Sequence, residues 1–428
     1  MRGSLILYNG VLLLLGVLGL PVWGAMAAWR PKYRAGFSSK LTGKTPMAGR
    51  REQAPVWFHA VSVGEVLASL PLVESMASLW APRAVWISTV TATGRAIAES
   101  RASGVKGTFY LPYDLPWSVE RAVGRMRPCV FVTAETELWP NLIMTMRRHG
   151  VKAAMVNGRI SDRSFPRYLK LRSLFKPVLQ SMDVLCMQSQ ESAERVLAMG
   201  APRDRVHVVG NLKFDLTVPS VDVAEWRKLL RLPHGAMVVV AGSTHPGEEE
   251  SILQAFQRLR EQHPSLHLIL APRAPERFPE VENLAARMGL PLRRRTGAGP
   301  AEAKVILLDT LGELAQVYGL ANVAFIGGSL VPRGGHNPLE AAAQARPVLF
   351  GPHMENFREI ASVLLQGGGA RSVENSEHLA KILGEMLARA ELAEEMGGRA
   401  RAVMLAHRGA TRKTLELLTP LVEGDRWG

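Results

Sequence analysis

The stretch that most clearly indicates the fold is residues 323–340, which reads VAFIGGSLVPRGGHNPLE. Its first four residues are apolar and predict a short buried strand, while Asn337 followed by Pro338 predicts the start of a helix. Glycines between a strand and a helix let the backbone approach a ligand closely, and the N–H groups at a helix start attract anions. The stretch therefore predicts a phosphate-binding loop, although it matches neither the Walker loop nor GxGxxG.

Glu340 would lie in the first turn of that helix. A carboxylate there is favourable beside the positive end of the helix dipole, and it can also accept hydrogen bonds from a ribose diol. The sequence leaves both interpretations open.

Outward from this loop, short apolar runs alternate with amphipathic helical stretches. Such alternation predicts an α/β protein with parallel sheets covered by helices on both faces, in which ligands bind beyond the carboxyl ends of the strands. The runs form two series, which predict two Rossmann-like domains facing a cleft: 56–60, 84–88, 129–133, 151–156, 184–187 and 206–209, then 237–241, 266–271, 305–308, 323–326 and 348–350.

The predicted domain organisation follows from the two series. We expect a membrane anchor over residues 1–29, an N-terminal domain over 30–210 and a C-terminal domain over 224–428. Residues 211–223 have little periodicity and are interpreted as a linker. The C-terminal part, from about residue 376, is predicted to be helical and able to pack back on the first domain.

The anchor is predicted because residues 5–29 contain no charged side chain. Such a length can cross a bilayer as a helix. Ala25-Met26-Ala27 is compatible with a signal-peptide cleavage site, which is the alternative. Only Arg2 precedes the segment, whereas seven Lys and Arg follow it between residues 30 and 51, and this asymmetry predicts a retained single span with the domains in the cytoplasm.

The net charge of +14 requires anionic partners. No zinc-ligand spacing, helix-turn-helix pattern or RNA-binding aromatic cluster stands out, so the sequence favours an anionic membrane over nucleic acid. Cys129 and Cys186 lie in apolar runs and predict buried thiols in a reducing compartment. No Asp-x-Asp sequence occurs, so we expect neither a metal nor another cofactor.

In the N-terminal domain, carboxylates follow two of the predicted strands. Glu65 lies at a strand-to-helix turn, where it can either stabilise the first turn or act as a general base. Glu135 and Glu137 follow another strand with i, i+2 spacing, so we expect only one of them, Glu135, to enter a site. The alternative is that both cap the next helix.

Cations follow the next strand of the same domain. Arg159 is close to its end, and Arg163, Arg167 and Lys170 have the i, i+4, i+7 spacing of one helical face. This face is either simply solvated or a binding surface for lipid headgroups or a phosphorylated acceptor.

In the C-terminal domain, two further loops extend toward the predicted phosphate. Ser243 and Thr244 form a small-residue turn before a helix, which suits a phosphate or a sugar. Arg273 ends the next strand and suits a phosphate or a nucleobase carbonyl, unless it is an ordinary surface arginine.

Four of these motifs together closely resemble the 3-deoxy-D-manno-octulosonic acid (Kdo) transferases of lipopolysaccharide synthesis. The resemblance covers nearly the whole chain and rests on HAVSVGE at 59–65, ETELWPN at 135–141, GSTH at 242–245 and GGHNPLE at 334–340. NGR at 157–159 is similar to the family's Asn-Ala-Arg run, and GNLKFD at 210–215 resembles its interdomain segment.

The resemblance implies a GT-B glycosyltransferase on the cytoplasmic face of a bacterial inner membrane. Such an enzyme transfers Kdo from CMP-Kdo to a lipid A precursor, with inversion at the anomeric carbon. By position, Glu65 matches the catalytic base and Glu135 an assisting carboxylate. The CMP-binding positions are matched by Arg273, Gly327, Gly328, Ser329, Asn337 and Glu340.

Two other classes of function are compatible with the sequence. A heptosyltransferase or a sugar-nucleotide 2-epimerase would share the two-domain fold, because the fold does not define the reaction. A membrane-tethered protein that binds acidic lipids without catalysis would use the basic N-terminal region alone.

Overall fold

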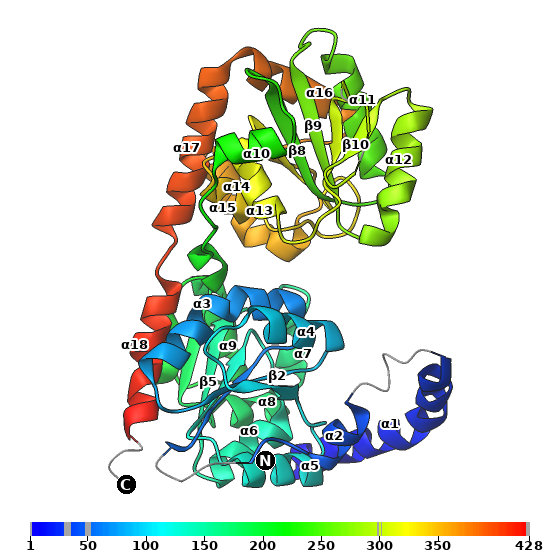
Figure 1. Ribbon diagram of the computed structural model, residues 1–428. Helices are drawn as coiled ribbons and strands as arrows, with labels where there is room; N and C mark the ends of the chain where they lie inside the picture. The colour runs from blue at the N-terminus through cyan, green and yellow to red at the C-terminus, as the bar shows by residue number, and fades with distance from the viewer. Residues whose placement is uncertain (1, 30–35, 48–52, 298, 301, 425–428) are drawn as a thin grey trace. The chain divides into compact units, whose positions relative to one another are not determined.

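The computed structural model describes residues 2–29, 36–47, 53–297, 299–300 and 302–424 (Figure 1). The chain divides into two compact units, and the division falls at residue 215, inside the segment interpreted as a linker. Unit 1 comprises Met1–Asp215 and Arg408–Gly428, and unit 2 comprises Leu216–His407. Each unit has one parallel sheet with helices on both faces, so the predicted α/β class is confirmed.

The sheet of unit 1 has seven parallel strands in the order β3-β2-β1-β4-β5-β6-β7. Chain order reverses beside β1, and this is the point of a doubly wound sheet where ligands bind. The central strands are continuous apolar runs because both faces are covered. The strands are β1 Val56–His59, β2 Val85–Thr89, β3 Gly107–Tyr110, β4 Val130–Ala134, β5 Lys152–Gly158, β6 Val184–Met187 and β7 Val206–Val208.

Two apolar cores lie on opposite faces of this sheet. One contains Leu72 and Met76 of α3 and Leu418 of α18, and the other contains Leu142 of α6 and Val196 of α9. The helices of unit 1 are α1 Arg2–Trp29, α2 Phe37–Thr42, α3 Val63–Leu79, α4 Ala92–Arg101, α5 Pro116–Met126, α6 Pro140–Arg148, α7 Phe165–Lys170, α8 Arg172–Leu179, α9 Gln190–Met199 and α18 Ala410–Glu423.

The sheet of unit 2 has the order β10-β11-β9-β8-β12-β13-β14 and is also parallel. Its strands are β8 Met237–Thr244, β9 Leu266–Pro272, β10 Leu292–Arg294, β11 Val305–Leu307, β12 Val323–Ile326, β13 Val348–Phe350 and β14 Ala370–Ser372. The sequence did not predict β3, β10 and β14, because these strands lie at sheet edges, are only three or four residues long and lack a continuous apolar run.

The helices of unit 2 cover both faces of its sheet. They are α10 Val223–Leu229, α11 Glu248–Leu259, α12 Phe278–Arg287, α13 Leu314–Val317, α14 Leu339–Ala343, α15 Arg358–Gln366, α16 Ser376–Ala388 and α17 Ala390–Ala406. Short 3₁₀ turns occur at Arg203–Arg205, Leu212–Asp215, Pro275–Arg277, Tyr318–Leu320 and Glu355–Phe357.

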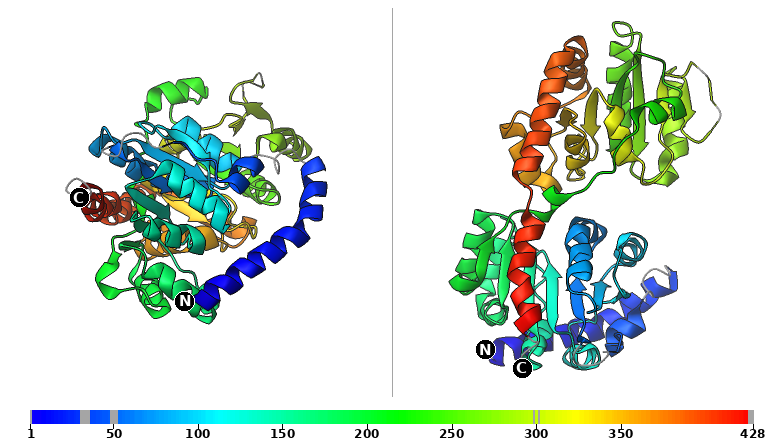
Figure 2. Two further views of the ribbon diagram at one scale, coloured as in Figure 1. Left: turned by 90° about the horizontal axis from the view of Figure 1, so that it is seen from below. Right: turned by 60° about the vertical axis from the view of Figure 1, so that its left-hand side comes forward.

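Of the C-terminal helices, α16 and α17 pack within unit 2, and only α18 belongs to unit 1 (Figure 2). The carboxylate of Asp215 holds the start of α18, because it accepts hydrogen bonds from the N–H groups of Gly409 and Thr411, at 2.7 and 2.5 Å. This places α18 beside α3 and the turn at Leu212–Asp215.

Residues 2–29 form α1, whose first turns are attached to unit 1 through polar side chains. The Tyr8 hydroxyl donates to Asp114 at 2.9 Å, and Asn141 donates to Asn9 at 2.6 Å. Of the helices in the described part of the chain, none is both long and apolar enough to span a membrane. The transmembrane span predicted for residues 1–29 is therefore not supported by the structure.

Candidate active site

In unit 1, Glu65 lies at the start of α3, directly beyond the carboxyl end of β1. The Glu65 N–H donates to the Ser62 hydroxyl at 3.5 Å, and the Glu65 carboxylate accepts from the Val61 N–H at 2.7 Å and from the Ser62 hydroxyl at 2.8 Å. This arrangement is a capping box, which fixes the side chain. Glu65 is only partly buried, so the cap holds it at the edge of the sheet without enclosing it.

Three carboxyl groups influence one another at this edge. Burial raises the pKa of Glu65, and the charge of Glu135 adds to the effect. Burial, together with the charges of Glu65 and Glu135, raises the pKa of Glu137 to about 7. A carboxyl with a pKa as high as that of Glu137 can take up a proton near neutral pH, which an isolated glutamate cannot do.

The cluster differs from the expectation that only Glu135 would enter the site. Glu135 has a φ of 53°, in the left-handed region, so the side-chain alternation of β4 does not continue through it. For this reason Glu135 and Glu137 both interact electrostatically with Glu65.

Lys213 supplies a cation that the sequence analysis did not assign to the site. Its Nζ lies 4.0 Å from Glu135 Oε1. The 3₁₀ turn that carries it is held at the sheet edge, because the Leu212 N–H donates to the Asn157 side chain at 3.0 Å. The GNLKFD motif at 210–215 was the only sequence signal for this lysine, and residue spacing does not show which strand end the lysine approaches.

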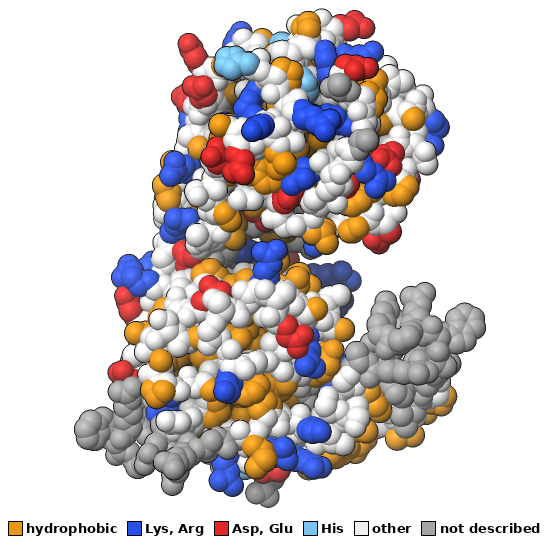
Figure 3. All heavy atoms as spheres, viewed as in Figure 1, with side chains coloured by type: hydrophobic (Ala, Val, Ile, Leu, Met, Phe, Trp, Pro, Cys, Tyr) orange, Lys and Arg blue, Asp and Glu red, His pale blue; other side chains and the backbone are white. Residues whose placement is uncertain are grey.

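The predicted basic face is only partly helical. Arg167 and Lys170 lie on α7, whereas Arg163 precedes the helix and Arg159 lies just beyond β5. Arg163, Arg167 and Lys170 are exposed, and Arg159 is half-buried. On the side shown in Figure 3, lysine and arginine side chains are spread over the surface, with apolar side chains between them.

In unit 2, the main-chain N–H groups of the turn after β12 already donate hydrogen bonds to a carboxylate of the chain itself. The N–H groups of Gly328, Ser329 and Leu330 donate to Glu248 at 2.6, 2.8 and 2.9 Å. The sequence analysis predicted that the glycine loop containing this turn binds a phosphate. The Ser329 hydroxyl is also engaged, since it donates to the carbonyl of Ile326 and accepts from the Gly351 N–H at 2.8 Å.

Gly327 brings this turn against the turn after β8. A Cβ at position 327 would lie 2.4 Å from the Ser243 carbonyl oxygen, so only glycine fits there. Ser243 has a φ of 56°, and the Thr244 side chain is fully buried. The main-chain atoms of Ser243 and Thr244 thus pack directly on the glycine turn.

Two histidines meet where these loops touch. The Nε2 atoms of His245 and His336 are 2.8 Å apart, and the rings are stacked with an interplanar angle of 3°. Burial, with a contribution from nearby arginines, lowers the pKa of both and brings that of His336 to about 4. The pair is therefore neutral at pH 7, with one ring donating its N–H to the other.

The remaining predicted residues of unit 2 lie at the same sheet edge. The Arg273 side chain is exposed, and the main-chain N–H of Arg273 donates to the Thr244 carbonyl at 3.0 Å. Asn337 caps the start of α14 by accepting from the Leu339 N–H at 3.1 Å. Burial raises the pKa of Glu340 to about 7, and the charge of Arg273 opposes this shift. Because α14 has only five residues, its dipole contributes little.

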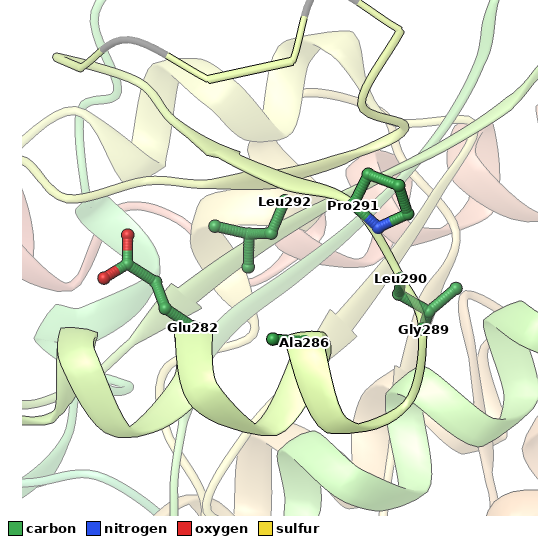
Figure 4. Close-up of a pocket in the computed structure, with 6 residues that line it drawn as sticks. All are labelled: Glu282, Ala286, Gly289, Leu290, Pro291 and Leu292. Carbon is green, nitrogen blue, oxygen red and sulfur yellow. The ribbon is translucent and has the colours of Figure 1, made fainter.

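A separate pocket lies between α12 and β10 (Figure 4). Its single charged lining residue, Glu282, is paired with Arg294 at 2.6 Å. The pocket contains none of the predicted site residues, since its lining is Glu282, Ala286, Gly289, Leu290, Pro291 and Leu292.

Comparison with known proteins shows the family of the chain. A family model described as 3-deoxy-D-manno-octulosonic-acid transferase (kdotransferase) matches residues 30–216. A Haemophilus influenzae 3-deoxy-D-manno-octulosonic acid transferase is 33% identical over 423 residues, covering 97% of this chain and 98% of its own. The chain belongs to the Kdo transferase family. A Bordetella pertussis Kdo transferase is 34% identical and covers 91% of this chain and 94% of its own.

Solved structures support the fold of this Kdo transferase. A glycosyltransferase from Rickettsia africae has a TM-score of 0.59 at 12% identity, and covers 86% of this chain and 99% of its own. A Listeria monocytogenes protein described as a putative UDP-N-acetylglucosamine 2-epimerase has the same TM-score at 14% identity, over 87% of this chain and 98% of its own. At these identities the likeness shows a GT-B-like architecture of two parallel-sheet domains, and the reaction class comes from the family.

Proposed function

We propose that this glycosyltransferase moves Kdo from CMP-Kdo to a hydroxyl group of a lipid A precursor, with inversion at the anomeric carbon. The observation that supports the proposal most strongly is the group of interacting carboxyls at the end of β1 and β4. Burial and mutual repulsion raise the pKa values of Glu65 and Glu137, which prepares this edge to accept a proton from a hydroxyl group.

In the proposed reaction, the bond between the Kdo anomeric carbon and the CMP phosphate breaks, and its electron pair leaves with the phosphate. The acceptor oxygen forms the new bond from the opposite face and loses its proton to Glu65. The carboxylate of Glu135 lies near the base, and Lys213, whose Nζ is 4.0 Å from Glu135 Oε1, offsets part of its charge. The neighbouring charges raise the affinity of Glu65 for that proton.

We place the donor at the carboxyl edge of unit 2. The Arg273 guanidinium is exposed there and suits the single phosphate of CMP. Glu340 is available to accept hydrogen bonds from ribose hydroxyls, and the loops of Ser243, Thr244, Gly327, Gly328, Ser329 and Asn337 shape the surface. A monophosphate leaving group that remains attached to its sugar needs one cation and fixed donors, so we propose that the transfer uses no metal cofactor.

We propose that the acceptor reaches unit 1 from the cytoplasmic face of an inner membrane. Arg163, Arg167 and Lys170 are exposed cations that can bind lipid phosphates, and the half-buried Arg159 is a further candidate. On α1, apolar side chains including Leu7 and Leu15 are 69% and 61% exposed, and an anionic bilayer would cover them. These exposed apolar and basic side chains are the observations that support the proposed membrane binding.

The proposal is tested by incubating purified protein with CMP-Kdo and a tetraacyl lipid A precursor, then measuring product mass. We expect the acceptor to gain at least one Kdo residue. ADP-heptose and UDP-N-acetylglucosamine serve as alternative donors. Transfer from either of these without transfer from CMP-Kdo would contradict the proposal, and so would an unmodified acceptor in every reaction.

A further inference from the structure

Glu248, the first residue of α11, makes an unusual set of contacts. Its carboxylate accepts four main-chain N–H groups: His245 from the turn after β8, at 2.9 Å, and Gly328, Ser329 and Leu330 from the turn after β12, at 2.6 to 2.9 Å. The residue has no exposed surface. Glu248 therefore joins two loops that are about 80 residues apart in the sequence.

The hydrogen-bond donors offset part of the effect of burial on this carboxylate. Burial raises the pKa of Glu248, whereas the four N–H groups oppose the shift. A carboxylate that accepts several N–H bonds forms short, charge-assisted contacts and holds their donors in fixed positions. The four N–H groups in turn have no need of a ligand, so a bound phosphate would have to be held by other groups.

The next residue, Glu249, has a different partner. Its carboxylate is 1% exposed and pairs with Arg277 at 2.6 Å, within α11 and the segment before α12. The two neighbouring glutamates are thus similarly buried, but the hydrogen bonds from the turn after β12 go to Glu248, whereas Glu249 pairs with Arg277. Glu249 is consequently a matched control for Glu248.

The two loops that Glu248 joins carry the side chains at the donor edge. His245 follows one loop directly, and its ring meets His336 of the other at 2.8 Å. A Cβ at Gly328, which has a φ of +69°, would come within 3.0 Å of the His336 ring. A shift of the Gly328–Leu330 turn would therefore move the histidine pair and the start of the Arg333–Asn337 segment.

We infer that Glu248 is a positioning residue that sets the two donor loops in their binding geometry before the donor arrives. The inference rests on the proposed function, in which this edge binds CMP-Kdo. Without the carboxylate, the turn would lose the acceptor of three N–H groups, and donor binding would have to order the loop. The ordering cost lowers affinity, so Glu248 acts on donor binding more than on the chemical step.

The test compares full-length E248Q, E248D and E249Q with the unaltered enzyme. Calorimetry gives the Kd for CMP, and steady-state assays give KM for CMP-Kdo and kcat. We expect E248Q to raise Kd and KM about tenfold or more, since an amide offers one oxygen acceptor and adds an unwanted donor. We expect kcat to change by less than about threefold, and E249Q to retain the Kd of the unaltered enzyme.

A second readout reports on the turn itself and does not depend on activity. Hydrogen exchange of peptides covering residues 327–331 should be faster in E248Q than in E249Q. E248D keeps the charge on a shorter side chain, so it should fold and give an intermediate Kd even if E248Q does not fold.

The outcomes separate this inference from the proposed function. If the unaltered protein binds CMP and E248Q or E248D binds it equally well, the inference is wrong and the proposed function stands. Equal exchange of the turn in E248Q and E249Q would overturn it as well. If the unaltered protein binds no CMP, the proposed donor site fails and the inference fails with it.

Discussion

Glu65 and Glu248 occupy corresponding places in the two units but have different surroundings. Each lies in the first turn of the helix that follows a central strand, β1 in unit 1 and β8 in unit 2. Glu65 accepts hydrogen bonds from Val61 and Ser62 and remains partly exposed. Glu248 accepts four main-chain N–H groups and has no exposed surface.

The comparison shows that a glutamate at a helix start is not defined by its position in the fold. A carboxylate with access to a ligand and a raised pKa can exchange a proton with that ligand. A fully enclosed carboxylate can only hold its neighbours in place. In the proposed function, proton transfer therefore takes place at the edge of unit 1, and the edge of unit 2 binds the donor.

The largest effect is expected for E65Q. Glutamine preserves the capping box because it still accepts a hydrogen bond, but it cannot take up the acceptor proton. We expect kcat to fall by about 10²- to 10⁴-fold, the range that general-base catalysis contributes. Transfer rates at saturating CMP-Kdo and acceptor measure this change.

E74Q is the matched control for E65Q. Glu74 lies on the same helix, and its carboxylate accepts hydrogen bonds from Ser103, away from the carboxyl cluster. E74Q should retain the kcat of the unaltered enzyme. A similar loss of kcat in both variants would mean that α3 was disturbed and that Glu65 had not been shown to be the base.

R273A should have the next largest effect, and on the other unit. Removing the exposed guanidinium should raise the Kd for CMP about 10- to 100-fold, because a charged hydrogen bond to phosphate is lost. Calorimetry measures the Kd, with R287A, at an exposed position at the end of α12, as the control. Unchanged CMP affinity in R273A would remove this arginine from the donor site.

A smaller effect is expected from the protonation of Glu340. Its pKa of about 7 means that the carboxyl becomes ionised as the pH rises from about 6 to about 8. The ionised form is the stronger acceptor and can bond one ribose hydroxyl at each oxygen, so CMP affinity should increase by a few-fold over this range. The Kd of E340Q should lack this part of the pH dependence, and identical pH profiles for both proteins would contradict the assignment.

The smallest effect concerns the stability of unit 1. The folded-state pKa of Glu137, about 7, lies above the value of about 4.3 in an unfolded chain. Between these values the folded state binds more protons, so stability decreases as the pH rises through this window. E137Q removes the charge, so its Tm should exceed that of the unaltered protein at pH 8 by about 2–4 °C for each 1 kcal/mol gained. The difference should disappear near pH 4, and a lower Tm for E137Q at pH 8 would be inconsistent with a buried, repelled carboxyl.

Features that depend on local sequence were predictable. The central strands contain continuous apolar runs, such as residues 130–132 of β4 and Val323–Ile326 of β12, so both sheets followed from the pattern. The positions at which Glu65, Glu135 and Arg273 leave their strands also followed, because the carboxyl ends of parallel strands share one edge.

Features that depend on distant contacts were not predictable from spacing. The N–H groups of Gly328 and Ser329 have a partner 80 or 81 residues away, so the glycine pattern suggested a free phosphate-binding turn. Lys213 reaches Glu135 only because its turn is fixed to Asn157. The role of Glu137 depended on the positive φ of Glu135, which the sequence does not reveal.

In the proposed mechanism, the edge of unit 1 transfers the proton and the edge of unit 2 positions the donor. The most direct test measures kcat for Kdo transfer and the Kd for CMP in E65Q and E248Q side by side. We predict that E65Q loses kcat and keeps its CMP affinity, whereas E248Q loses CMP affinity and keeps most of its kcat. If both variants lost kcat with CMP affinity unchanged, or both lost CMP affinity alone, the claimed division between the two edges would be contradicted.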